Sequence, residues 1–140
     1  MKGDLQVIEY LNKALRHELT AVNQYWLHYR LLAGGIIRWQ DTAQGVDPGN
    51  AACRPIIERI IFLDGAPNMQ TLEALHIGQT VKEAVERDLH AELDARSVYQ
   101  AAASHCHSVR DYVTRDLFET LMHDEEEHVD FFGDSTRSDW

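Results

Sequence analysis

The chain has 140 residues, of which 44% are hydrophobic and 26% are charged, and its formal net charge is −10. This balance predicts one soluble globular domain, and the acidic charge argues against a nucleic-acid backbone as a partner. Two cysteines give no disulfide framework, no apolar signal sequence opens the chain, and no apolar run approaches the ~20 residues of a transmembrane helix. We therefore expect a cytoplasmic protein without a nucleic-acid or membrane partner.

The first predicted element is a long amphipathic helix from Leu5 to about Leu32. Glu18 falls on its apolar face, and Tyr25 lies further along the same face. A lone glutamate there is usually an edge residue, and a core tyrosine usually finds some polar partner, so neither residue indicates a site by itself. The apolar residues that recur at helical spacing are Ile8, Leu11, Leu15, Leu19, Val22, Trp26 and Tyr29.

The helical pattern is lost between Gly34 and Pro55, where glycine and proline recur. Sequence rules predict a loop over this range, although a connection of this length is unusual inside a compact domain. Helical spacing resumes over Ile56–Leu63, and Gly65 is expected to cap the C-terminus of that helix. A polar connection then runs to Gly78.

The third predicted helix runs from about Thr80 to Ser104. Glu92 interrupts its apolar face, as Glu18 interrupts the face of the first helix. The other residues of that face are Val81, Val85, Leu89, Ala95 and Tyr99.

The last predicted helix runs from Val109 to about Phe132, after a capping box formed by Ser108 and Asp111. Residues 133–140 show no helical period, so we expect them to form an irregular, disordered tail.

An acidic run, Asp124–His128, lies within this last helix. Such runs are usually solvated, and three of its carboxylates fit that interpretation. Glu125 and His128, however, are spaced so that both fall on the apolar face of the helix. A buried carboxylate needs a compensating partner, and inward-facing Glu-x-x-His pairs hold the di-metal sites of helix bundles. The apolar residues of this face are Leu117, Leu121, Val129 and Phe132.

Three predicted helices thus carry inward-facing metal-ligating side chains: Glu18, Glu92, Glu125 and His128. In an antiparallel bundle they would converge as oxygen donors with one imidazole, a set that suits iron or manganese better than structural zinc. Tyr25 would hydrogen-bond a bound carboxylate. The remaining histidines lack this convergence and are expected on the surface or in loops. They are His17, His28, His76, His90, His105, His107 and His123.

Four segments carry a family resemblance and cover most of the chain. They are MKGDLQVIEYLNKALRHELTAVNQYWLHYRLLA (1–33), IIERIIFLDGAPNMQ (56–70), IGQTVKEAVERDLHAELDAR (77–96) and DYVTRDLFETLMHDEEEHVDF (111–131). In these segments the chain closely resembles the bacterioferritin family of ferritin-like di-iron proteins. The resemblance implies an all-α, ferritin-like four-helix bundle with a long crossover between its second and third helices.

The resemblance also implies a function in iron storage and detoxification. Members of the family oxidise Fe(II) at an intra-subunit di-iron ferroxidase centre and store ferric mineral in a shell of two dozen subunits. Glu18 and Glu125 would be terminal ligands, Glu92 a bridging carboxylate and His128 the imidazole ligand, with Tyr25 beside the centre. The family further implies haem b, a ferredoxin-type reductant and a homo-oligomer, which in this case could include a second bacterioferritin subunit.

The second helix departs from the family pattern, which there resembles E-S-I-x-E-M-x-H-A-D-R and supplies a bridging glutamate, a haem-ligating methionine and a histidine. None of these stands between Gly34 and Pro55, and Met69 and Met122 occupy other family positions. Codons allowed for Gly45 to Pro55, read one nucleotide downstream, permit Glu-Ser-Ile-x-Glu-Met-Gln-His-Ala-Asp. The same shift from Phe131 to Trp140 permits Leu-Glu-Thr-Gln-Leu-Asp-Leu-Ile. We hypothesise frameshifts across the second helix (34–55) and at the C-terminus.

Two other functions share these residues. A non-catalytic shell subunit would co-assemble with intact bacterioferritin subunits, because only part of the di-iron site is written in this sequence. A di-iron oxidase of the wider ferritin-like group would use the same ligands on an organic substrate.

The frameshift hypothesis predicts that the intact protein does not have the mass of the written sequence, 16.0 kDa. Mass spectrometry of the purified protein and resequencing of its gene are the measurements. A chain of 16.0 kDa that ends at Trp140 would contradict the hypothesis.

Overall fold

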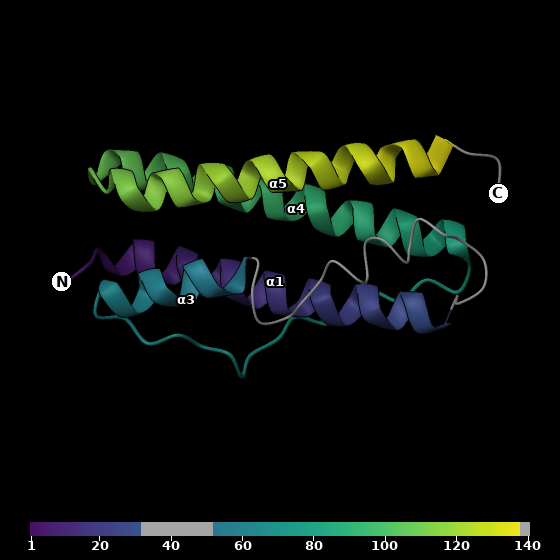
Figure 1. The fold of residues 1–140 in the computed structure, drawn as a ribbon, viewed down its shortest axis with the longest axis horizontal. Helices are drawn as coiled ribbons and strands as arrows, with labels where there is room; N and C mark the ends of the chain where they lie inside the picture. Colours follow the sequence, from purple (N-terminus) through teal and green to yellow (C-terminus); the bar gives the residue numbers. More distant parts are fainter. Residues whose placement is uncertain (32–51, 138–140) are drawn as a thin grey trace.

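The computed structural model describes residues 1–31 and 52–137, which within these ranges form α-helices and no strand (Figure 1). The helices are α1 (Leu5–Leu31), α3 (Cys53–Phe62), α4 (Val81–Ser108) and α5 (Tyr112–Arg137). α1 lies beside α3, α4 packs along α5, and the segment between α3 and α4 runs back along the bundle (Figure 1). The all-α fold and the long crossover are therefore as predicted.

The crossover decides how the helices are directed. α1 and α3 are antiparallel, and so are α4 and α5, but the returning segment makes α3 and α4 run in the same direction (Figure 1). As a result α4 lies along both α1 and α5 (Figure 1). None of the described helices is long and apolar enough to cross a membrane.

The turn between α4 and α5 differs from the predicted capping box. α4 continues through Ser108, whose Oγ donates a hydrogen bond to the carbonyl of His105 at 2.6 Å. Asp111 caps α5 instead, because its Oδ1 accepts from the backbone N–H of Thr114 at 3.0 Å and from Arg59 Nη2 at 2.9 Å. Burial raises the pKa of Asp111, but the bonds from Thr114 and the charge of Arg59 outweigh it and hold this pKa below its usual value.

The end of α3 also corrects a prediction. Asp64, not Gly65, takes the left-handed conformation, with φ 61°. The N–H of Gly65 donates to the carbonyl of Ile60 at 2.9 Å, which completes a Schellman motif. A Cβ on Gly65 would lie 2.8 Å from Ile8 Cγ2. Glycine is therefore required here by the close approach of α1 and not by its own dihedral angles.

Two further boundaries differ from the sequence prediction. α5 is helical through Arg137, so the irregular tail predicted from residue 133 is wrong for 133–137, while 138–140 lie outside the described residues. An established helix gains one backbone bond for each residue added, and nothing before Arg137 interrupts it. α3 begins at Cys53, because Pro55 in the first turn needs no backbone N–H. The predicted loop and frameshifted segment at 34–55 lie largely outside the described residues.

Two apolar clusters form the core. Trp26, which the periodicity placed on the apolar face, is 54% exposed, with Arg30 over its ring at 5.3 Å. The buried face of α1 near this end passes instead through residues such as Tyr25 and His28. Among the buried residues, Leu11, Leu15, Ile56, Ile60, Tyr99, Phe118 and Leu121 belong to the larger cluster, and Ala21, Tyr25, Ala84, Val85 and Phe132 form the smaller one.

Candidate metal centre

The three inward-facing glutamates lie between the two apolar clusters. Along α1, α4 and α5 respectively, Glu18, Glu92 and Glu125 separate residues of the larger cluster from residues of the smaller one. Glu92 and Glu125 are each 2% exposed. The sequence therefore places carboxylates where each helix turns its apolar face to the others, and the fold brings them together as predicted.

Glu125 is shared by two groups of side chains that could each hold a metal ion. Ligand atoms of His17, Glu18 and Glu125 all lie within 4.8 Å of one another, and the same holds for Glu92, Glu125 and His128. The two groups overlap only at Glu125. This arrangement provides two adjacent cation positions with one carboxylate common to both.

Glu18 accepts a hydrogen bond from a tyrosine that was predicted only as part of the apolar face of the third helix. Tyr99 Oη donates a hydrogen bond to Glu18 Oε1 at 2.6 Å. Burial and the charge of Glu125 raise the pKa of Glu18 well above its ordinary value, and the bond from Tyr99 offsets only part of this increase. Burial and the charge of Glu18 likewise raise the pKa of Tyr99, which therefore remains a donor. A bound cation would offset this burial and repulsion and favour the ionised carboxylate.

His128 balances the other two carboxylates. Its Nδ1 lies 3.4 Å from Glu92 Oε2 and 3.4 Å from Glu125 Oε2. Its contacts, with Glu125 first and Glu92 second, raise the pKa of His128 to about 10. The side chain is 46% exposed, in contrast to the two glutamates that it contacts. His128 is therefore an imidazolium at neutral pH and must lose a proton to bind a metal.

Two buried oxygens lack hydrogen bonds. Glu92 Oε2 makes none, although it lies 3.4 Å from His128 Nδ1. Tyr25 Oη also makes none, and its ring packs against Phe132 with 5.8 Å between centroids. Tyr25 thus bonds no carboxylate among the described residues, and its place beside the centre stays a prediction. Nearly all buried polar atoms in proteins have partners, so the Glu92 oxygen indicates room for a further polar species. Carboxylate oxygens with imidazole suit iron or manganese, and the residues present fit such an ion.

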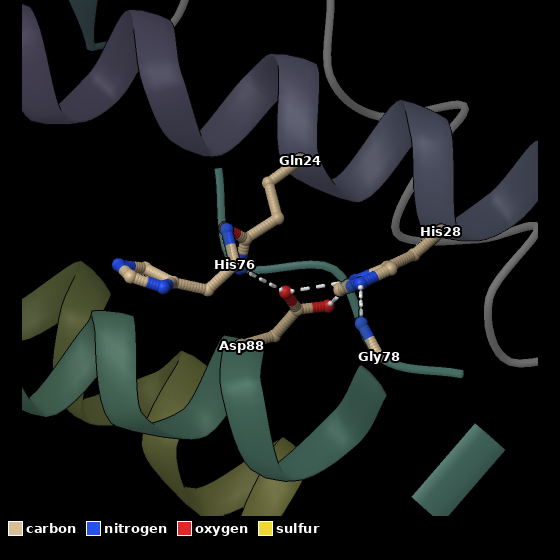
Figure 2. A network of polar contacts seen from close by, with 5 residues as sticks. All are labelled: Gln24, His28, His76, Gly78 and Asp88. Carbon is tan, nitrogen blue, oxygen red and sulfur yellow. Dashed lines mark hydrogen bonds and ion pairs between the residues drawn. The ribbon is translucent and has the colours of Figure 1, made fainter. Parts of the chain in front are cut away.

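His28 contradicts the prediction that it lies on the surface or in a loop, since it is 0% exposed (Figure 2). Its Nδ1 lies 3.1 Å from both oxygens of Asp88, and its Nε2 accepts from the N–H of Gly78 at 2.9 Å. Gln24 Nε2 donates to Asp88 at 2.7 Å, while Gln24 Oε1 accepts from the N–H of His76 at 2.9 Å. This network ties the crossover to α1 and α4. An imidazole that accepts at Nε2 donates at Nδ1 to Asp88.

Asp88 is the charged member of this network. Burial raises the pKa of Asp88, and its hydrogen bonds with His28 and Gln24 oppose the increase. The sequence could have indicated this buried network, because Asp88 and His28 both occupy interior positions of long amphipathic helices. His17 was also assigned to the surface or a loop, and the structure places it partly buried beside Glu18. The histidines at 76, 90, 107 and 123 are exposed, as predicted.

Comparison with known proteins places the chain in a family. Residues 50–137 match the family model described as a ferritin-like domain. Bacterioferritin from Brucella melitensis biotype 1 is 48% identical over 134 residues, which span 94% of this chain and 83% of that protein. Bacterioferritin from Rhodobacter capsulatus is 46% identical over 134 residues, with the same coverage of both chains. The chain belongs to the bacterioferritin family.

The fold agrees with a solved bacterioferritin. The structure of the Rhodobacter capsulatus protein superposes with a TM-score of 0.92 at 43% identity, covering 97% of this chain and 86% of that chain. That structure is described as having a metal-free dinuclear site and a haem iron in a crystallographic special position. The predicted family and the predicted four-helix bundle are both confirmed.

The pKa shifts predict that metal-free protein becomes less stable as pH rises. Above pH 4.5, the ordinary pKa of Glu18, the folded state holds more protons than the unfolded state, so the free energy of unfolding falls. The contacts of His128 stabilise the folded state fully below pH 6.5, the ordinary pKa of histidine. This contribution is lost as the pH rises through about 10, the pKa of His128 in the folded state. Glu18→Gln should therefore flatten the decline in melting temperature of chelator-treated protein between about pH 5 and about pH 8.

The exposed Glu127 provides a matched control for this measurement. Glu127→Gln should keep the pH dependence of the unsubstituted protein. An equal slope for Glu18→Gln and Glu127→Gln would show that Glu18 titrates normally in the folded state.

Proposed function

We propose that the protein is a cytoplasmic iron-storage protein that oxidises Fe(II) at a dinuclear centre built from Glu18, Glu92, Glu125 and His128. The observation that carries this proposal is the sharing of Glu125 by two adjacent groups of ligands. Two metal positions joined by one carboxylate are the arrangement that a two-metal oxidation requires. The similarity to bacterioferritins across nearly the whole chain supports iron as the metal.

The side chains have separable roles in this proposal. Fe(II) is the substrate, and two bound ions would supply one electron each to dioxygen or peroxide. Tyr99 holds Glu18 in place by its hydrogen bond, and His128 releases a proton when a cation binds. The anionic carboxylates favour the ferric state, because their attraction grows with the charge of the ion.

The geometry supports different ligand roles for Glu92 and Glu125 from those that the family resemblance implied. The resemblance made Glu92 the bridging carboxylate and Glu125 a terminal one. Glu125 belongs to both ligand groups and Glu92 to one, so we assign the bridging role to Glu125 and a terminal role to Glu92.

Haem binding is not part of this proposal. The chain has three methionines, and the family's ligand position in the second helix carries none. Met69 lies exposed in the crossover, and Met122 on α5 packs against the larger apolar cluster. Neither stands where the family resemblance places the haem ligand.

A non-catalytic subunit of a mixed shell is the second candidate function. One observation favours it: residues 32–51 contain neither glutamate nor histidine, so the written sequence supplies no metal ligand of the family type there. In this case the protein would assemble with intact bacterioferritin subunits and contribute to the shell without oxidising iron.

Oxidation of Fe(II) separates the two candidates. Purified protein mixed with Fe(II) in air should form ferric species far faster than the protein-free solution, followed by ultraviolet absorbance in a stopped-flow instrument. Glu92→Ala should reduce the rate to that of the protein-free solution, because it removes a ligand from one metal position. Glu127→Ala, an exposed carboxylate of the same acidic run, should leave the rate unchanged. An unsubstituted protein without any acceleration would favour the non-catalytic subunit.

The size of the assembly tests the storage function. A shell of about two dozen chains, each of 16.0 kDa, has a mass on the order of several hundred kilodaltons. We expect size-exclusion chromatography with light scattering to show this mass. A dimer would instead support the di-iron oxidase that acts on an organic substrate.

A further inference from the structure

Histidine is scarce near the α1 side of the centre. The chain has eight histidines, and none of them falls within residues 32–51, where the family resemblance expects an imidazole ligand. His128 supplies an imidazole to the group that contains Glu92. The group that contains Glu18 would need its own nitrogen donor from elsewhere in the described chain.

His17 meets this requirement from the position directly before Glu18. One of its ring nitrogens lies within 4.8 Å of ligand oxygens of both Glu18 and Glu125. Its Nε2 is buried and has no hydrogen-bond partner. The ring stands edge-on to Tyr99, with centroids 6.3 Å apart and planes at 85°. Tyr99 therefore orients the His17 ring and the Glu18 carboxylate together.

We propose that His17 is a metal ligand, which joins Glu18 and Glu125 to hold the second metal ion of the centre. This inference rests on the proposed dinuclear function and extends it, because it assigns each metal position one imidazole. His17 serves the α1 side, His128 serves the α5 side, and Glu125 lies between them. For the sequence as written, the imidazole that the second helix does not supply comes from the first helix.

Two other histidines, His28 and His123, do not provide this donor. His28 is committed to Asp88 at one nitrogen and to Gly78 at the other. His123 forms a group with Asp124 and Glu127, but all three are exposed and lie on one helix. Among the described histidines, His17 and His128 are the ones grouped with the buried carboxylates.

His17 also borders open space. Two hollows of about 240 and 210 Å³ lie between α1, α4 and the crossover, and His17 lines both. Glu73 and Asp94 line both hollows, but each hollow also has a basic side chain, Arg87 in the larger and Lys13 in the smaller. The negative charge that attracts a cation to His17 therefore comes from Glu18 and Glu125.

Anaerobic titration with Co²⁺ tests this assignment without relying on activity. Binding is followed by the visible absorption of Co²⁺ and by the metal content of dialysed protein. We expect two Co²⁺ per chain for the unsubstituted protein and one for His17→Gln. The affinity for the second Co²⁺ should fall by more than the roughly 10- to 100-fold that is lost when a residue supporting a ligand is removed. His17→Phe keeps an aromatic ring against Tyr99 and removes both nitrogens, so it should also bind one.

Two further variants complete the comparison. His128→Gln should lose the other ion and also retain one Co²⁺ per chain. His90 is an exposed histidine on α4, and the His90→Gln variant should retain two Co²⁺ per chain. Two Co²⁺ per chain with unchanged affinity in both His17 variants would overturn the role of His17 and leave the dinuclear centre standing. Fewer than two in the unsubstituted protein would overturn the dinuclear centre itself, and the role of His17 with it.

A measurement on the unsubstituted protein covers the case in which the His17 variants do not fold. With Co²⁺ bound, imidazole protons of coordinated histidines give strongly shifted NMR signals that disappear in D₂O. We expect signals from two histidines at full loading. Signals from a single histidine would overturn the role of His17.

Discussion

Three carboxylates close together between two apolar clusters, with Glu92 and Glu125 buried and Glu18 partly buried, are the constraint around which this bundle is built. Their negative charges repel one another, and the apolar surroundings screen this repulsion poorly. The protein offsets this repulsion with a hydrogen bond from Tyr99 to Glu18 and with the imidazolium of His128 beside Glu92 and Glu125. Compensation is incomplete, because the pKa of Glu18 stays raised and Glu92 Oε2 has the 3.4 Å ion pair with His128 but no hydrogen bond. A bound cation would offset the remaining repulsion between the carboxylates most directly.

The distance between these carboxylates depends on contacts far from the centre. The network of His28, Asp88 and Gln24 joins α1 to α4 and holds the crossover against both (Figure 2). At the opposite end, Arg59 joins α3 to the cap of α5 at Asp111. Because both ties are polar and directional, they specify one register of the helices, which apolar packing alone would specify less strictly. A slip by one turn would separate Glu18 from Glu125.

The proposed centre is asymmetric in the origin of its ligands. α5 supplies Glu125 and His128 from a single Glu-x-x-His unit, whereas the α1 side combines the adjacent residues His17 and Glu18. Neighbouring residues on a helix point about 100° apart, so His17 reaches the centre only from its edge. Such a site gains a nitrogen donor without a second ligand helix.

The sequence by itself determined the helical class, the family and the inward positions of Glu18, Glu92 and Glu125, because helical periodicity and the spacing of Glu-x-x-His are local properties. It could not determine that Tyr99 bonds Glu18, that His28 is buried with Asp88, or that His17 lies beside Glu125. These contacts join residues far apart in the chain, and they exist only once the crossover has set the directions of the helices. The cap at Asp111 belongs to the same class, because Arg59 of another helix stabilises it. Tertiary structure decided which polar side chains meet, since the period of a helix specifies a face and not the partner that the face meets.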